Sequence, residues 1–126
     1  MKTSVYWLLL TILEEIETEK KNPFGFGMIL GTKLAEELAL NELPEDTLYL
    51  AEYAIDAFNA YFECTLDRFH ENNELHVFVK EESIKNVSKE IMELVAGTVT
   101  AIVERIQNKR IRIKTYPANC QMIISR

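Results

Sequence analysis

The chain has 126 residues, a formal net charge of −6 and a composition that is 48% hydrophobic and 27% charged, with 4 Gly and 3 Pro. This length fits a single domain over residues 1–126 that buries roughly two-thirds of the surface of the unfolded chain. The acidic balance argues against nucleic-acid binding, because that function needs a basic surface that displaces counterions from phosphates.

The chain begins with two predicted helices separated by a turn. Apolar residues at helical spacing over 5–16 predict a core helix that ends near Lys21. Its apolar run is too short to cross a bilayer, and no signal-peptide cleavage site follows it. Residues 22–25 contain Asn, Pro and Gly, which predict a turn, and we expect a second helix over about 26–40.

A third helix is predicted after a break at residues 41–44. Pro44 and the acidic residues that follow it are typical of a first helical turn. Apolar residues then recur at spacings of three and four from Leu48 to Phe69. This stripe predicts one long helix with a wide apolar face that packs against more than one neighbour.

The remaining elements are strands and one further helix. Residues 75–79 are rich in β-branched and aromatic side chains and predict a strand. Ser83 suits the N-cap of a helix over about 84–106, and residues 110–115 and 121–125 predict an antiparallel hairpin. The elements together predict an α+β fold, with about four helices packed mainly on one face of an antiparallel sheet of three to four strands.

Residues that could carry catalysis or bind a metal do not form a recognisable motif. The spacing of His70 and His76 matches no metal-binding pattern, and an exposed pair is the favoured interpretation. Cys64 and Cys120 form neither a disulfide framework nor a metal motif, which favours a reducing cytoplasmic location. The sequence therefore predicts no catalytic site, no cofactor and no metal.

One basic cluster interrupts the acidic sequence near the C-terminus. Alternation with a period of two would place three of its members on one strand face. The favoured interpretation is the solvated outer face of a sheet, and binding of an acidic partner is the alternative. The cluster consists of Lys109, Arg110, Arg112 and Lys114.

Glycines at helical positions are the most informative feature. Gly27 and Gly31 lie four residues apart in the second predicted helix, and Gly97 lies inside the last one. Each costs roughly 1 kcal/mol relative to Ala in a helix, so a close contact should offset the loss. Close packing within one chain is the favoured explanation, and a subunit contact and an apolar ligand cavity are the alternatives.

The order of these elements and two motifs resemble a known family: the small Bet-type subunits of the transport protein particle (TRAPP) and the related prokaryotic 4-vinyl reductase domains. Residues 95–104, around Gly97, are similar to the family's glycine-containing last helix. The matching residues of the second helix are Gly27, Gly31, Lys33, Leu34, Glu36 and Leu38.

The resemblance implies helices on one side of a sheet, dimerisation through the helical face, and assembly into tethering complexes on intracellular membranes. It does not imply acylation, because Leu43 and Pro44 occupy the region where acylated subunits have a cysteine. The 4-vinyl reductase domains tend to have paired cysteines around the last two strands, and this chain has only Cys120 there. The chain is shorter than the eukaryotic subunits of the family, so the resemblance implies a minimal prokaryotic or archaeal member.

The leading hypothesis is a non-enzymatic assembly subunit that forms a homodimer, or a heterodimer with a similar subunit. It implies no transmembrane segment and leaves peripheral membrane association open. The alternative is a sensor that holds an apolar ligand in a cavity near Phe58, Phe62 and Gly97. The residues expected at the packing or dimer interface are Tyr6, Trp7, Gly27, Gly31, Leu34 and Leu38.

Overall fold

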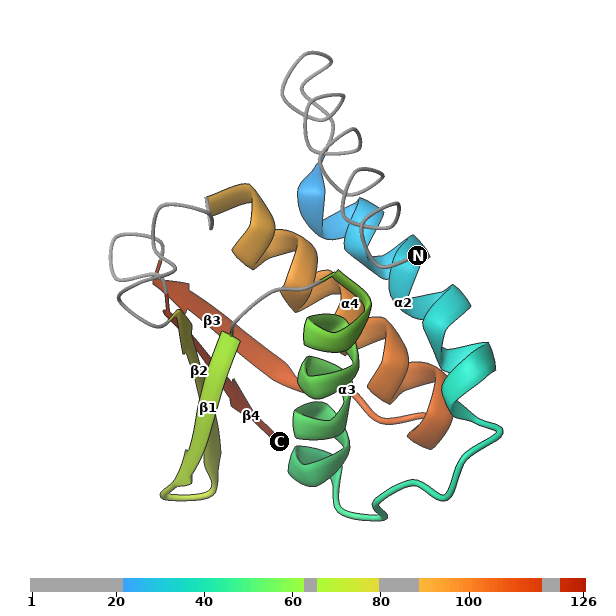
Figure 1. The fold of residues 1–126 in the computed structure, drawn as a ribbon. Coiled ribbons are helices and arrows are strands. Elements are labelled where there is room, and N and C mark those ends of the chain that lie inside the picture. Colours follow the sequence, from blue (N-terminus) through green and yellow to red (C-terminus); the bar gives the residue numbers. More distant parts are fainter. Residues whose placement is uncertain (1–21, 63–65, 80–88, 117–120) are drawn as a thin grey trace.

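The computed structural model describes residues 22–62, 66–79, 89–116 and 121–126 (Figure 1). In these segments it has an α+β fold, as predicted, with three helices and one four-stranded antiparallel sheet. The helix expected over 5–16 lies outside the described residues, as do Tyr6, Trp7 and both cysteines. In chain order the elements are α2 (Pro23–Leu38), α3 (Thr47–Phe62), β1 (Leu66–Glu71), β2 (Glu74–Val79), α4 (Lys89–Gln107), β3 (Arg112–Tyr116) and β4 (Gln121–Ser125).

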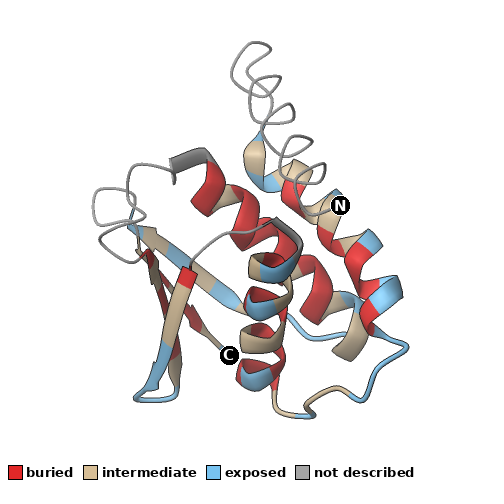
Figure 2. Ribbon diagram, viewed as in Figure 1, coloured by how far each residue is buried: buried red, intermediate tan, exposed pale blue. Residues whose placement is uncertain are grey.

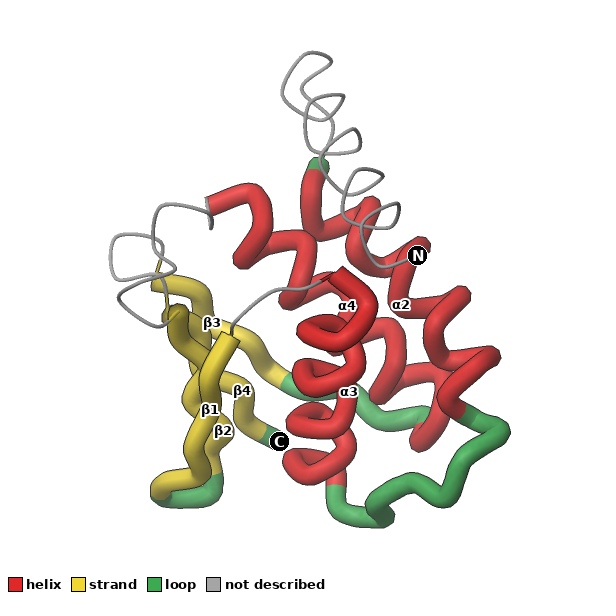
Figure 3. The backbone as a smooth tube through the Cα atoms, viewed as in Figure 1, coloured by secondary structure: helices red, strands yellow, loops and turns green. Residues whose placement is uncertain are grey.

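The elements form layers on one side of the sheet. The strand order is β1-β2-β4-β3, and every neighbouring pair is antiparallel. Helices α3 and α4 pack on one face of the sheet, and α2 packs against α4 on the side away from it (Figures 1 and 3). The other face of the sheet carries none of the three helices.

Helix α2 begins earlier than the sequence pattern predicts. Asn22 is its N-cap, because the side-chain Oδ1 accepts a hydrogen bond of 3.0 Å from the amide of Phe24. Pro23 occupies the first helical position, where its missing N–H has no consequence. The Asn-Pro pair that predicts a turn is therefore the start of the helix, which continues to Leu38.

Helix α3 begins at Thr47, so Pro44 precedes the helix and the prediction that it opens the first turn is wrong. Asp46 is the N-cap: its Oδ1 accepts hydrogen bonds from the amides of Leu48 and Tyr49, at 2.9 and 3.2 Å. A carboxylate at this position satisfies free amides and interacts favourably with the helix dipole.

The prediction that this helix continues to Phe69 is also wrong. Leu66 and Phe69 belong to strand β1, which pairs with β2. The side chain of Asn59 accepts a hydrogen bond from the Leu66 amide at 3.1 Å and donates one to its carbonyl at 2.8 Å. Both hydrogen bonds fix the start of the strand beside α3.

A tight turn of two asparagines joins β1 to β2. Asn72 and Asn73 have positive φ values of 52° and 60°, as a type I′ turn requires. The twist of this turn matches that of the two strands it joins, so it sets their register. The polar stretch between Phe69 and the predicted strand 75–79 is thus a hairpin turn.

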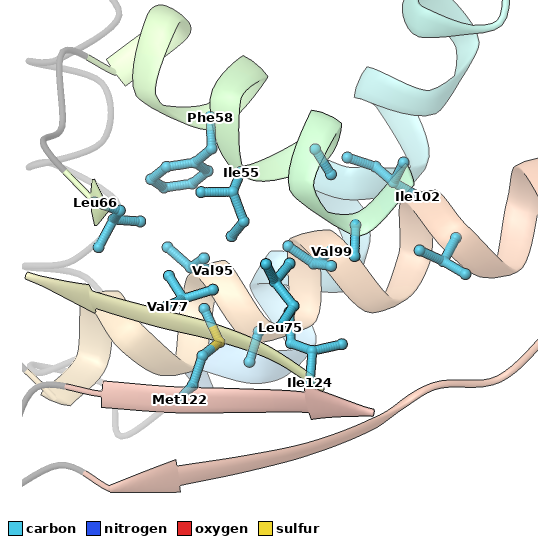
Figure 4. Packing of buried hydrophobic residues seen from close by; sticks show 14 of the residues in the cluster. Ile55, Phe58, Leu66, Leu75, Val77, Val95, Val99, Ile102, Met122 and Ile124 are labelled. Atoms are coloured by element: carbon cyan, nitrogen blue, oxygen red, sulfur yellow. The ribbon is translucent and has the colours of Figure 1, made fainter. Parts of the chain in front are cut away.

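The core lies between the sheet and the helices α3 and α4. Alternate residues of β2 and β4 point towards the helices and are buried, whereas their neighbours face the other way. Figure 2 shows the buried residues concentrated on the surfaces that face one another. Figure 4 shows the strand side chains and those of the helices meeting in this layer; its labelled residues are Ile55, Phe58, Leu66, Leu75, Val77, Val95, Val99, Ile102, Met122 and Ile124.

Candidate protein-binding surface

The glycines of α2 lie against α4 of the same chain. A Cβ added to Gly27 would overlap the carbonyl oxygen of Leu94 and lie 3.0 Å from the Cα of Gly97. A Cβ added to Gly31 would overlap the carbonyl oxygen of Thr98. Neither position has room for a side chain, so the two helices approach through their backbones.

Gly97 makes the reciprocal contact from α4. A Cβ there would overlap the carbonyl oxygen of Phe24 and lie 3.0 Å from the amide nitrogen of Met28. The next residue, Thr98, is fully buried, and its hydroxyl donates a hydrogen bond of 2.8 Å to the carbonyl of Leu94. The hydroxyl of Thr98 therefore has a hydrogen-bond partner within α4, although the crossing buries it.

The other residues expected at an interface or a cavity lie inside the protein, where the structure describes them. Leu34 and Leu38 are 7% and 6% exposed and belong to the core cluster. Phe58 is fully buried between α3 and the sheet, whereas Gly97 faces α2, so these two do not line a common cavity. The side chain of Phe62 lies outside the described residues.

A surface hollow of about 250 Å³ lies where the start of α2, α4 and β3 meet. Its lining combines apolar and polar side chains, and the hollow is partly open to the surface. These residues are Asn22, Phe24, Glu93, Ala96, Ile113 and Thr115. Neither Phe58 nor Gly97, which were expected to line a ligand cavity, is among the lining residues of the hollow.

The outer face of the sheet is the face that does not pack against α3 or α4 (Figure 1). Each strand contributes the residues that alternate with its buried ones, and strand pairing arranges them in three rows. In the order β1, β2, β4, β3 these rows are Asp67, Phe78, Gln121 and Tyr116; then Phe69, His76, Ile123 and Lys114; and last Glu71, Glu74, Ser125 and Arg112. We call these twelve residues the outer face.

Aromatic side chains cluster on the β1–β2 half of the outer face. The rings of Phe69 and His76 stack with centroids 4.7 Å apart and an interplanar angle of 5°, and Phe78 lies 5.8 Å from Phe69. Phe69 and Tyr116 are 42% and 41% exposed. A solvated sheet face is usually polar, so this aromatic content is typical of a surface that binds another molecule.

His76 is held in place on the outer face by polar neighbours. Its Nε2 lies 3.8 Å from Glu74 Oε1, and its Nδ1 lies 3.4 Å from Gln121 Nε2. His70 points to the opposite side of the sheet, where its Nε2 lies 3.2 Å from Glu52 Oε1 and its ring lies 4.6 Å from that of Tyr49. The two histidines are therefore on opposite faces.

Charges of opposite sign mark the two edges of the outer face. Arg112 and Lys114 are exposed on the edge strand β3, while Glu71 is exposed on the opposite edge strand β1. Arg110 precedes β3, so only two members of the predicted basic cluster share this strand face. The sequence pattern identified the basic side of the surface, but the acidic side depends on β1, which it missed.

A charged cluster connects β1 to α3 beside the core. Arg68 Nε is buried and lies 3.2 Å from a carboxylate oxygen of Glu52 and 3.2 Å from one of Asp56, without hydrogen-bond geometry. Its Nη2 donates to Asp56 Oδ2 at 3.2 Å. Burial raises the pKa of the Asp56 carboxyl, an effect that Arg68 only partly offsets and that Glu52 increases. The cluster ties the edge strand to the helix.

Comparison with known proteins finds no protein-family model, no curated protein and no solved structure that matches this chain. Within the described segments, no three or more His, Cys, Asp or Glu side chains are grouped so that they could hold a metal ion. No helix in the same segments is both long and apolar enough to cross a bilayer.

Proposed function

We propose that this chain is a non-enzymatic assembly subunit that forms a homodimer, or a heterodimer with a similar subunit. The observation that carries the proposal is the outer face, where Phe69 and Tyr116 are about two-fifths exposed on edge strands of opposite charge. Aromatic side chains are enriched in protein interfaces, and this face presents them together with charged groups.

The glycine crossing supports the same function. Because backbone meets backbone at Gly27, Gly31 and Gly97, helix α2 packs closely on α4, which favours a rigid scaffold. A rigid scaffold loses little conformational entropy on association, which favours binding. The resemblance to TRAPP subunits adds a role in vesicle-tethering-like or related scaffolding to the proposal.

The alternative function is binding of a small apolar ligand, as in 4-vinyl reductase domains. The surface hollow favours it, because Phe24 and Ile113 provide apolar walls and Glu93 a polar group. The core between the helices and the sheet gives it no support, because Phe58, Leu75 and the other side chains there are fully buried against one another.

Light scattering and sedimentation velocity of the purified chain test assembly directly, at concentrations from about 1 to 100 µM. The proposal predicts a dimer within this range, or recovery of a related subunit by affinity purification from the source cells. A chain that stays monomeric throughout and recovers no related subunit would refute it. Native mass spectrometry of the same sample tests the alternative, which requires a retained apolar molecule.

A further inference from the structure

We infer that the outer face binds a second copy of this chain, with a two-fold axis that runs parallel to the strands between β2 and β4. The inference rests on the proposed assembly function and specifies its partner and geometry. It follows from the strand order β1-β2-β4-β3 together with the distribution of charge across the sheet.

Symmetry restricts how two copies of one sheet can pack face to face. In a two-fold dimer each surface meets the same surface of the other copy, so it must be complementary to itself. An axis parallel to the strands places β1 opposite β3 of the second copy, and β2 opposite its β4. The sheets then pack nearly aligned, about 10 Å apart and about 30° off parallel because of their twist.

The pairing of rows makes this arrangement complementary at its edges. Glu71 and Arg112 lie at the two ends of the same row, so the axis places Glu71 of one copy opposite Arg112 of the second copy. The next row has Phe69 at one end and Lys114 at the other. This row would pair an aromatic ring with an ammonium group, a favourable contact. Both contacts occur twice in the dimer.

The two central strands contribute Phe78 and Ile123 to the contact, together with the polar residues Glu74, His76, Gln121 and Ser125. His76 would lie opposite Ile123 of the second copy, and Phe78 opposite its Gln121. His76 is already stacked on Phe69, with its side chain 15% exposed, so these rings need little reorganisation to be covered. The charged groups stay at the rim, where they retain water and set the orientation more than the affinity.

The other aligned arrangement is unfavourable. An axis perpendicular to the strands places each strand opposite itself, with Glu71 on the acidic edge of the second copy and Arg112 on its basic edge. Like charges would then face each other at both edges, which selects against this orientation. The charge distribution therefore identifies one of the two axes.

The size of the sheet indicates a weak dimer. Four strands about 4.8 Å apart and five residues long, at about 3.3 Å per residue, give a face of about 19 by 17 Å. Such a face, about 320 Å² per copy, is smaller than a standard protein interface and is typical of weak, transient contacts, so we expect a dissociation constant of about 100 µM.

Reversal of charge at the two edges tests the geometry. We expect Glu71→Arg and Arg112→Glu each to weaken homodimerisation by about tenfold, because each converts two attractive pairs into two repulsive ones. An equimolar mixture of the two single variants should dimerise like the wild type, since every edge pair then regains opposite signs. The double variant should also recover dimerisation. Sedimentation velocity measures all four samples.

Two substitutions on the exposed side of α2 are the controls. Glu36→Arg and Lys33→Glu make the same changes in charge away from the sheet and should leave the dissociation constant within about twofold. Recovery in the mixture also proves that both variants are folded.

Each other outcome overturns the inference. A dimer that none of the outer-face variants weakens uses another surface, so the inference fails while the proposed assembly function survives. Single variants that weaken dimerisation without recovery in the mixture would rule out the proposed axis. A wild-type chain that is monomeric but binds a related subunit also refutes self-association, and a monomer with no partner refutes the assembly function as well.

Discussion

Gly27 of α2 lies directly against the carbonyl oxygen of Leu94 in α4, where even a methyl group would overlap that oxygen. The α-hydrogen that replaces a side chain at Gly27 points to this oxygen, in the arrangement of a weak Cα–H···O contact. Close approach of two backbones also brings many atoms into van der Waals contact. These gains offset the intrinsic cost of glycine in a helix, so the contact explains the sequence feature.

Substitution at this crossing should destabilise the fold. We expect Gly27→Ala to lower the free energy of unfolding by about 3 kcal/mol, because the neighbouring atom is backbone and the helices must separate to admit a methyl group. Gly25→Ala is the matched control in the same helix, since its Cβ would lie 3.9 Å from the nearest side-chain atom. The control should change stability by less than about 1 kcal/mol. Urea denaturation of both variants measures the difference, and equal effects would contradict this account.

The N-cap of α3 should make stability depend on acid pH. Burial alone would raise the pKa of Asp46, but hydrogen bonds from the Tyr49 and Leu48 amides and from Arg126 hold that pKa below its usual value. A lowered pKa in the folded state gives stabilisation that is present above about pH 4 and is lost as the pH falls through the folded value.

Two substitutions separate the cap from the charge at Asp46. Asp46→Ala should lower stability at pH 7 by about 1 kcal/mol, because two helix amides lose their acceptor. Asp46→Asn keeps an acceptor and should lose less stability at pH 7. Between pH 5 and pH 2 its stability should also decline less than that of the wild type, because it has no carboxylate to protonate. Urea denaturation at several pH values provides the measurement; identical pH profiles would argue against a charged cap.

Removal of the cation between α3 and β1 should be most damaging at neutral pH. Arg68→Met leaves the carboxylates of Glu52 and Asp56 without their shared counter-ion. Burial already raises the pKa of Asp56, and loss of Arg68 should raise it further, so the folded state takes up a proton at a higher pH. Its stability should then fall as the pH rises through that value.

The expected loss for Arg68→Met is about 1 to 2 kcal/mol at pH 7 and less at pH 4, where the Asp56 carboxyl is partly protonated. Lys33→Met removes a cation from the exposed side of α2 and is the control, with little change at either pH. Chemical denaturation at the two pH values distinguishes them. A loss that is equal at pH 4 and pH 7 would mean that packing of the Arg68 side chain, rather than its charge, stabilises the junction.

The β1–β2 turn should tolerate glycine better than a branched residue. Asn73 has a φ of 60°, which glycine adopts freely and valine does not. We expect Asn73→Gly to change stability by less than about 1 kcal/mol and Asn73→Val to lower it by about 1 to 2 kcal/mol. Thermal unfolding compares the pair; a stable Val variant would show that the turn can adopt another conformation.

Much of the fold was predictable from local pattern. Strand β2, helix α4 and the β3–β4 hairpin have periodicities that identify them. The structure confirms these elements, with α4 from Lys89 onward; the predicted N-cap Ser83 lies outside the described residues. The predicted third helix was too long because Leu66 and Phe69 continue the apolar spacing of α3 by coincidence. The better signal was the Asn72-Asn73 pair, since both residues tolerate the positive φ of a tight turn.

The candidate surface depends on long-range pairing, which periodicity does not encode. Arg112 and Lys114 could be assigned to one strand face, but their relation to Glu71 required the strand order across the whole sheet. The glycines present the same difficulty: their cost in a helix is local, whereas the partner atoms at Leu94 and Thr98 are distant in sequence. Contacts between separated segments therefore account for most of what the sequence left undecided.

The position of β4 between β2 and β3 has a consequence for folding during synthesis. Strand β3 pairs only with β4 in the sheet, and β4 is made after every other described element. Until residues 121–125 leave the ribosome, β2 exposes an unpaired edge and β3 has no hydrogen-bonding neighbour. The unpaired edge of a strand can form hydrogen bonds with another chain, which leads to aggregation. Completion of the sheet is thus a late step, and the nascent chain is most vulnerable just before it.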